Sequence, residues 1–474
     1  MYFDSTIFLF LILPLIVGIY FLIGKRFRNL YLFVLNILIY ACGEPFFVLL
    51  LLASMTINYF IGYGIDKNNE NKSKAKTLLI LGIIFNLLIL VFFKYFMSLN
   101  KLINNLLSIF TNKNYKLIKI ALPLGISFYT FQAISYIVDI YNNKVKVQKN
   151  YIKFGLYFSF FAQIVAGPIV RYKDIESQLD DRNITLDSFA DGLKQFLIGL
   201  LQKILFANYF SRIANIVFET NPNTLGGATA WIGIIFYALQ IYFDFAGYSS
   251  MAIGLAKMFG FDFKKNFDYP YISCSIKEFW RRWHISLSSW FRDYVYIPMG
   301  GNKKGKARMY LALFVVFVLS GLWHGSSLTF LVWGAYHGLF IIIEKLPPIE
   351  KILNKTPKLL RHIGTMLVVL IGWVFFRSPN IIYAFNYIGS LLFIHGFNTN
   401  MPPVSIFVII LFVFGVVAST PILTYIKNKV YVTDNKTLIN TLLLIGYILL
   451  ILCFIACIPV ILSGTTSPFI YAQF

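Results

Sequence analysis

Long apolar runs separated by short charged loops make up most of this chain. They recur from the first run, Ile7 to Leu22, to the last, at about residues 438–462. A membrane-spanning helix needs about 20 apolar residues, so the runs leave room for about ten or more crossings. The pattern predicts an all-α polytopic membrane protein.

The charges that flank the first run predict its orientation. Lys25, Arg26 and Arg28 follow the run, and no basic residue precedes it. A secretory signal peptide has the reverse order, and basic loops stay on the cytosolic side of a membrane. We therefore expect an uncleaved first helix whose N-terminus lies outside the cell.

Composition supports the same class. Of 474 residues, 58% are hydrophobic and 13% are charged, whereas a soluble domain has about 25% charged residues. This excludes a soluble enzyme and a disordered protein, and it leaves no soluble domain to bind nucleic acid. The four cysteines form no CxxC motif, and no His/Cys cluster has zinc-site spacing.

The chain has a net charge of +22, and its most basic part is residues 257–308. Residues 257–308 hold eleven basic and four acidic residues, so we expect this segment on the cytosolic side. Four of its cations lie close together and form a candidate docking site for a phosphate-rich acyl donor: Lys303, Lys304, Lys306 and Arg308. They could equally be an anchor at the membrane surface, contacting anionic lipid.

An uncharged stretch contains the first candidate catalytic residue. Met309–Ile343 has no Asp, Glu, Lys or Arg over 35 residues. One straight helix of that length would measure about 52 Å, against a hydrocarbon core of about 30 Å. We expect a break at Ser320–Ser327, where glycines and serines surround His324. Because irregular backbone at membrane depth must be buried in protein or line a wet cavity, His324 is a candidate general base; the alternative is a structural histidine.

Residues 277–294 have the periodicity of an amphipathic helix. Phe279, Trp283 and Leu287 belong to an aromatic and apolar face, and Arg281 belongs to a polar face. His284 lies at the boundary, where a side chain could face a cavity. The alternative is a helix lying in the lipid headgroups.

Two acidic residues, Asp139 and Asp244, interrupt apolar runs. An unpaired charge at the bilayer centre costs about 2.5–3.5 kcal/mol on insertion scales. Each should therefore have a partner, and we expect an Arg or Tyr from residues 281–296. A buried pair that ties helices together is the interpretation we favour.

Several ordered motifs resemble the membrane-bound O-acyltransferase (MBOAT) family, and in particular its alginate O-acetyltransferase-like branch. The matching motifs are Phe279–Ser288, Trp323–His324–Gly325, Arg292–Asn302, Leu122–Gln132 and the C-terminal Pro468–Phe474. The similarity covers nearly the whole chain. Ala162, Ala246 and Ser250 depart from the family pattern, which usually has Pro, Ser and Asp at these positions.

The resemblance implies a fold and a location. The fold is a ring of about 10–12 tilted transmembrane helices, with re-entrant or interfacial helices and a central tunnel. A single integral-membrane domain would cover residues 1–474, with N-terminal helices at 1–120, a catalytic core at 121–400 and C-terminal helices at 401–474. The location is the bacterial plasma membrane.

The resemblance also implies an activity. His324 would be the catalytic residue, either as base or as the residue that holds the acyl group, and His284 its companion. The tunnel would be lined by Trp323, Trp283, Arg281, Arg282, Ser286, Asp244, Tyr129 and Gln132. The donor would be acetyl-CoA or another thioester, such as that of an acyl carrier protein, with no metal or tightly bound cofactor.

The acceptor in this branch is usually a separate extracytoplasmic protein of the SGNH-esterase type. That protein passes acetyl groups to an extracellular polysaccharide such as alginate or cellulose. Two other functions remain open: D-alanyl transfer from a carrier protein to teichoic acid, and polysaccharide transport without chemistry.

Overall fold

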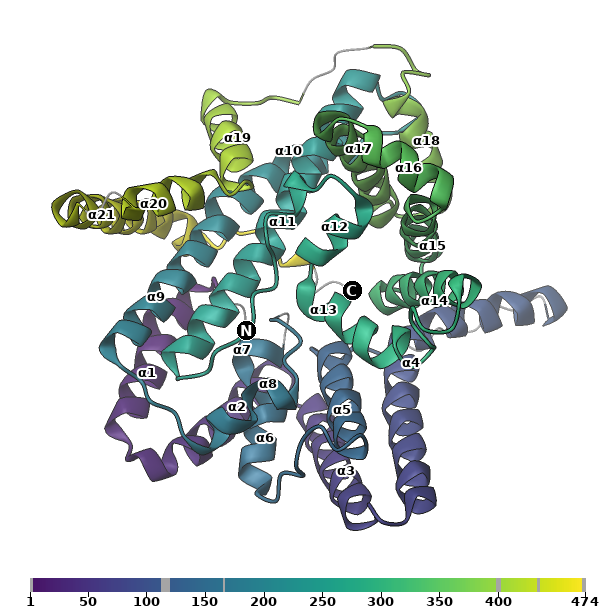
Figure 1. Ribbon diagram of the computed structural model, residues 1–474. Coiled ribbons are helices and arrows are strands. Elements are labelled where there is room, and N and C mark those ends of the chain that lie inside the picture. Colours follow the sequence, from purple (N-terminus) through teal and green to yellow (C-terminus); the bar gives the residue numbers. More distant parts are fainter. Residues whose placement is uncertain (1–2, 112–119, 165–166, 398–401, 433–434, 471–474) are drawn as a thin grey trace. The chain divides into compact units, whose positions relative to one another are not determined.

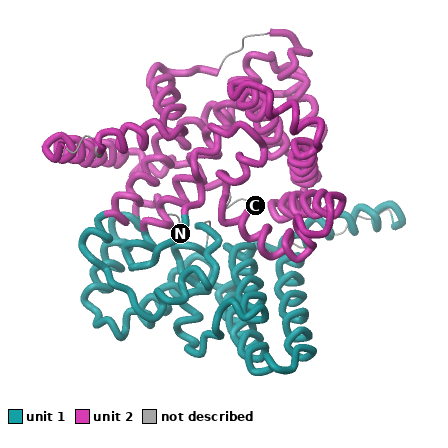
Figure 2. Tube along the Cα trace, in the orientation of Figure 1, with its two compact units in different colours: residues 1–3, 7–190, 255–264 teal, residues 4–6, 191–254, 265–474 magenta. Residues whose placement is uncertain are grey.

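The regular elements of the computed structural model are helices throughout its described residues, which are 3–111, 120–164, 167–397, 402–432 and 435–470. Figure 1 shows this arrangement, and it confirms the all-α prediction. The chain forms two compact units (Figure 2). The first comprises residues 1–3, 7–190 and 255–264, and the second comprises residues 4–6, 191–254 and 265–474. The division at residues 120 and 400 stays a prediction.

The first unit is built largely from the N-terminal helices. They are α1 (Leu13–Leu22, extended by the π-helical Phe8–Ile12), α2 (Arg28–Gly43), α3 (Phe47–Lys67), α4 (Lys72–Thr111), α5 (Ile126–Tyr141), α6 (Tyr151–Ser159), α7 (Phe161–Ile164) and α8 (Tyr172–Asp180). Asn58 and Asn86 are buried between α3 and α4 and exchange amide hydrogen bonds of 3.0 and 2.8 Å. The exchange satisfies both amides in an apolar setting.

The second unit begins within α9 (Leu186–Leu201) and contains most of the later helices. They are α10 (Asn208–Glu219), α11 (Gly227–Met258), α12 (Ile276–Arg282), α13 (Ile285–Phe291), α14 (Lys306–His324), α15 (Leu328–Glu344), α16 (Pro347–Lys355), α17 (Lys358–Arg377), α18 (Ile381–Leu391), α19 (Ile406–Ala418), α20 (Ile422–Val432) and α21 (Lys436–Leu462). A π-helical segment, Gln202–Ala207, joins α9 to α10.

Six helices among the described residues are long and apolar enough to cross a membrane: α3, α4, α11, α14, α17 and α21. The bent pairs α15–α16 and α19–α20 raise the number to eight. The polytopic class is confirmed, with fewer candidate spans than the ten to twelve expected, because other apolar helices such as α18 are short. The ring and the tunnel stay predictions.

Helices α14 and α15 form a tight hairpin within the second unit. A Cβ added to Gly321 would meet the carbonyl oxygen of Phe330, and one added to Gly334 would meet that of Phe317. Only glycine permits this backbone approach. At the open end of the hairpin, the Tyr310 hydroxyl donates to the carbonyl of Lys345. Because the 19 residues of α14 span about 28 Å, His324 lies far from this basic end.

Candidate active site

His324 is the last residue of α14, where the chain turns into α15. Gly325 has extended backbone angles, and the side chain of Ser327 caps α15 by accepting from the Thr329 amide. The expected break at Ser320–Ser327 is confirmed. Its physical cause is that the run is too long for one span, and Gly321 permits the backbones of the two helices to pack closely.

Aromatic rings surround the imidazole of His324, and this residue is 3% exposed. The ring centroids of Trp323, Trp333 and Phe376 lie 4.9, 5.1 and 5.0 Å away, all edge to face. Phe330 adds a stacked contact at 6.2 Å. This apolar surrounding limits access of bulk water and restricts the orientation of the ring.

His284 lies at a sharp break between α12 and α13. Its backbone is left-handed, with φ 44° and ψ 57°, a conformation that costs a non-glycine residue roughly 1–2 kcal/mol. The prediction of one continuous helix over 277–294 is therefore wrong. The reason is that Asn266, outside the helix, accepts from the amide groups of Ile285 and Ser286 at 2.9 and 3.1 Å. The amide groups of Ile285 and Ser286 therefore do not need hydrogen bonds to carbonyl groups of a preceding helical turn.

The same asparagine sets the tautomer of His284. Asn266 Oδ1 accepts from the Ser286 amide and hydroxyl, at 3.1 and 2.9 Å, and its Nδ2 donates to Ser249 Oγ at 3.0 Å. Since this oxygen is an acceptor, His284 Nδ1, 3.2 Å away, is the donor. The lone pair of the neutral imidazole is then on Nε2. Burial lowers the pKa of His284 to about 3, so the ring is neutral at physiological pH.

The two histidines meet at one tryptophan. The centroid of the Trp323 ring lies 6.2 Å from that of His284 and 4.9 Å from that of His324. The residues come from positions 40 apart along the chain. The second unit therefore brings the two predicted histidines to one place, separated by an indole.

A cavity of about 340 Å³ lies next to two of the aromatic rings that surround His324. Phe330 and Phe376 line it and also contact the His324 ring. Its other walls come from α10, α11, the end of α17 and the C-terminal segment around Ser467. It therefore lies at the end of the α14–α15 hairpin that is remote from Lys306.

The comparison with protein families agrees with this geometry. The family model for membrane-bound O-acyltransferases matches residues 145–385, a range that includes both histidines. The chain belongs to the membrane-bound O-acyltransferase family. The resemblance inferred from the motifs is confirmed, and the protein is an acyltransferase of this class.

Relatives of this acyltransferase have names that refer to alginate, peptidoglycan and teichoic acid. The chain is 42% identical over 384 residues to the "probable alginate O-acetylase AlgI" of Pseudomonas aeruginosa, covering 80% of this chain and 73% of the relative. It is 32% identical over 430 residues to the peptidoglycan O-acetyltransferase of Helicobacter pylori, covering 83% and 80%. It is 34% identical over 233 residues to the teichoic acid D-alanyltransferase of Bacillus subtilis, covering 46% and 58%.

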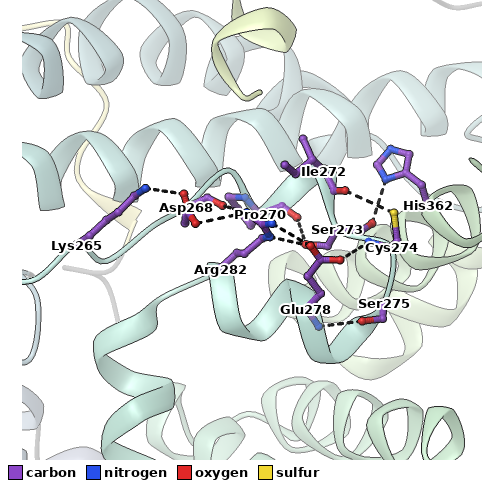
Figure 3. A network of polar contacts seen from close by, with 10 residues as sticks. All are labelled: Lys265, Asp268, Pro270, Ile272, Ser273, Cys274, Ser275, Glu278, Arg282 and His362. Carbon is purple, nitrogen blue, oxygen red and sulfur yellow. Dashed lines mark hydrogen bonds and ion pairs between the residues drawn. The ribbon is translucent and has the colours of Figure 1, made fainter. Parts of the chain in front are cut away.

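A polar network holds the segment before His284 in this acyltransferase (Figure 3). Ser275 caps α12 by accepting from the Glu278 amide at 3.0 Å, and Glu278 accepts from the Cys274 amide at 2.9 Å. Arg282 bonds to Glu278 and to the carbonyl of Asp268, each at 3.0 Å. This arrangement resembles a capping box with an added ion pair, and it fixes the direction from which the chain enters the break.

Asp244 is ion-paired with Lys203 of the π-helical segment, and both side chains are 2% exposed. Lys203 also donates to the carbonyl of Ser467 at 2.7 Å, and Asp244 accepts from the Ile470 amide at 2.8 Å. The expectation of a partner from residues 281–296 is wrong for Asp244, because its ion-pair partner is Lys203, 41 positions upstream. Asp139, in the first unit, lies 3.8 Å from Lys144 and 3.7 Å from Lys173.

The other tunnel candidates fall into three groups. Trp283 is buried and stacks on Phe279 at 5.6 Å, and Ser286 bonds to Asn266, so both lie beside His284. Arg281 is exposed and Arg282 belongs to the polar network. Two further candidates, Tyr129 and Gln132, are buried in α5 of the first unit. Their role in a tunnel stays a prediction.

The candidate donor-docking residues Lys303, Lys304, Lys306 and Arg308 are exposed before and at the start of α14. The Arg308 guanidinium donates to the carbonyl of Met299 at 2.7 Å. Of the C-terminal motif, Tyr471–Phe474 lies outside the described residues. The motifs did not indicate three residues of this region: Asn266, which bonds to His284, Lys203, which pairs with Asp244, and Arg377, which lines the cavity. A lysine inside an apolar run was a usable signal for Lys203, whereas nothing local marked the other two.

Proposed function

We propose that this acyltransferase moves an acetyl group from a cytosolic thioester, acetyl-CoA or an acyl carrier thioester, to a hydroxyl group reached from outside. The result is O-acetylation of an extracellular polysaccharide such as alginate or cellulose, at the bacterial plasma membrane. The proposal includes an N-terminus outside the cell. The names of the relatives that match over about four-fifths of the chain support it.

The observation that carries the proposal is the pair of buried imidazoles on one indole. A thioester is already activated, so the protein has to remove the acceptor's proton and keep out water, which would hydrolyse the donor. Base catalysis by a positioned group contributes roughly 10²–10⁴-fold. His324, within its aromatic surroundings, takes that proton in our proposal, and the rings around it exclude bulk water.

His284 has a different role in this scheme. With Nδ1 donating to Asn266, its Nε2 accepts hydrogen bonds. It is therefore suited to orient a donor group of the substrate, such as the acceptor hydroxyl. Donation to the developing oxyanion would need the other tautomer or the imidazolium, and the lowered pKa of His284 disfavours the imidazolium.

The two substrates approach from opposite ends of the α14–α15 hairpin in this proposal. The exposed cations from Lys303 to Arg308 attract the phosphate groups of the donor from the cytosolic side. The acceptor enters through the cavity beside Phe330 and Phe376. The ends are about 28 Å apart along α14, so the acyl group has to travel part of that distance through the protein.

The partners follow from the same scheme. The acceptor is a separate extracytoplasmic protein of the SGNH-esterase type, which acetylates the polysaccharide. D-alanyl transfer to teichoic acid has less support, because the similarity to that relative covers 46% of this chain. Transport without chemistry has no support from the relatives' names.

The test is polymer-bound acetate in cells that express wild type or a single His→Ala variant at equal membrane levels. His324→Ala and His284→Ala should each abolish acetylation, while export of the polymer continues. His395→Ala is the matched control, because this half-buried histidine lies outside the site. Normal acetylation in both site variants would refute the proposal, and altered export with unchanged acetylation would favour a transporter.

A further inference from the structure

The cavity next to His324 has an unusual balance of polar groups. Its volume of about 340 Å³ lies at the small end of ligand pockets, which measure roughly 300–1,000 Å³. Of the described residues that line it, Arg377 is the one with a charged side chain, and the polar others include Asn215, Gln240 and Ser327. The cavity therefore has a single positive charge and room for one sugar-sized group.

The Arg377 guanidinium is held in place without a neutralising carboxylate. Its Nη2 donates to Asn215 Oδ1 at 2.9 Å, and its central carbon lies 5.7 Å from the Phe218 ring and 5.9 Å from the Tyr237 ring. No carboxylate forms an ion pair with it within the described part of the chain. A guanidinium has five N–H donors in a fixed fork, and this fork matches the geometry of a carboxylate.

Gln240 supplies the complementary group. It lines the same cavity and is 6% exposed, and its Oε1 is buried with no hydrogen-bond partner among the described residues. An unsatisfied buried acceptor costs about 1–3 kcal/mol, so a ligand that donates a hydrogen bond there recovers this energy. A hydroxyl group is such a donor.

Because Arg377 and Gln240 line the same cavity, we infer that this cavity binds a hydroxylated carboxylate of the acyl acceptor. Arg377 takes the carboxylate and Gln240 Oε1 takes a hydroxyl proton. Both are specificity-determining residues at the entrance to the His324 site. The assignment of this ligand to the acceptor rests on the proposed acyl transfer, whereas the binding site itself does not.

The single cation favours a carboxylate over a phosphate monoester. A carboxylate has one negative charge, which one guanidinium neutralises. A phosphate monoester has a charge of about −1.5 to −2 at pH 7, and no second cation lines the described cavity. Tighter binding of a phosphate monoester than of a carboxylate would therefore contradict the inference.

The experiment is equilibrium binding of small probes to the purified full-length protein in nanodiscs. The probes are glucuronate, uncharged glucose and glycerol 3-phosphate. Wild type should bind glucuronate at least about tenfold more tightly than glucose, as expected for one charge-assisted pair. Arg377→Gln should bind the two sugars equally. Arg361→Gln, at the opposite end of the same helix, is the matched control and should keep the preference.

The remaining variants separate the alternatives. Gln240→Leu should weaken the binding of glucuronate and of glucose by the same several-fold factor. If Arg377→Gln does not fold, Arg377→Lys replaces it and should retain only part of the preference for glucuronate. Equal affinities in wild type, no binding of glucuronate, a preference that survives Arg377→Gln, or tighter binding of glycerol 3-phosphate would overturn the inference. His324→Ala should bind normally. Failure of acetyl transfer by the wild type, with an intact preference for glucuronate, would refute only the proposed function.

Discussion

Asn266 offers the sharpest test of how the protein prepares His284. Its Oδ1 accepts three hydrogen bonds, from His284 Nδ1 and from the amide and hydroxyl of Ser286. A net contribution of about 0.5–1.5 kcal/mol each gives roughly 1.5–4.5 kcal/mol for Asn266→Ala. About 1 kcal/mol of this fixes the tautomer of the imidazole, which corresponds to about a fivefold change in the ratio of the two His284 tautomers.

Asn266→Asp separates orientation from charge. It keeps an acceptor oxygen beside Nδ1, but a carboxylate next to His284 favours the imidazolium and raises its pKa from about 3. In wild type, protonation of His284 should not limit kcat between pH 5 and pH 8, because the ring is neutral well below that range. In Asn266→Asp, kcat should fall as the pH drops through the raised pKa and recover at higher pH.

The assay is acetyl transfer by purified protein at a series of pH values, together with thermal unfolding. Ser249→Ala is the matched control: it removes only the acceptor of the Asn266 Nδ2 donation, so it should cost about 1 kcal/mol of stability and leave the pH profile unchanged. A wild-type kcat for Asn266→Ala, or an unshifted pH profile for Asn266→Asp, would refute the reasoning.

Three further predictions concern the scaffold and the donor. Gly321→Ala should lower the melting temperature and disrupt the hairpin, because its Cβ meets the Phe330 carbonyl; Gly364→Ala, with open space around it, should be neutral or slightly stabilising. Asp244→Asn should destabilise by about 3–5 kcal/mol because it leaves a buried charge, whereas the double change Lys203→Met with Asp244→Leu should restore most of this stability in thermal unfolding. Neutralising the four cations of 303–308 should raise KM for acetyl-CoA several-fold at unchanged kcat, and the difference should shrink at high salt.

The sequence predicted the features that depend on local pattern. The uncharged Met309–Ile343 run is longer than a membrane is thick and contains glycines at its middle, so the break beside His324 followed from its length and its glycines. The helical class and the family followed equally well from the apolar runs and the ordered motifs.

The features that the sequence did not predict depend on distant residues. The helix breaks at His284 because Asn266, 18 positions upstream, accepts hydrogen bonds from the first two amide groups of α13. Asp244 is paired with Lys203, 41 positions away. Helical periodicity takes account only of residues within one helix. The periodicity of residues 277–294 therefore predicted a continuous helix through His284.

The most direct test of the central claim is transfer of labelled acetyl from acetyl-CoA by the purified protein with an esterase-like partner. The claim predicts transfer by wild type and by His395→Ala, and loss in His324→Ala and His284→Ala. It further predicts that the double variant is no worse than the more impaired single variant, because groups that act as one unit are not additive. Full transfer by either site variant, or strictly multiplicative losses, would contradict it.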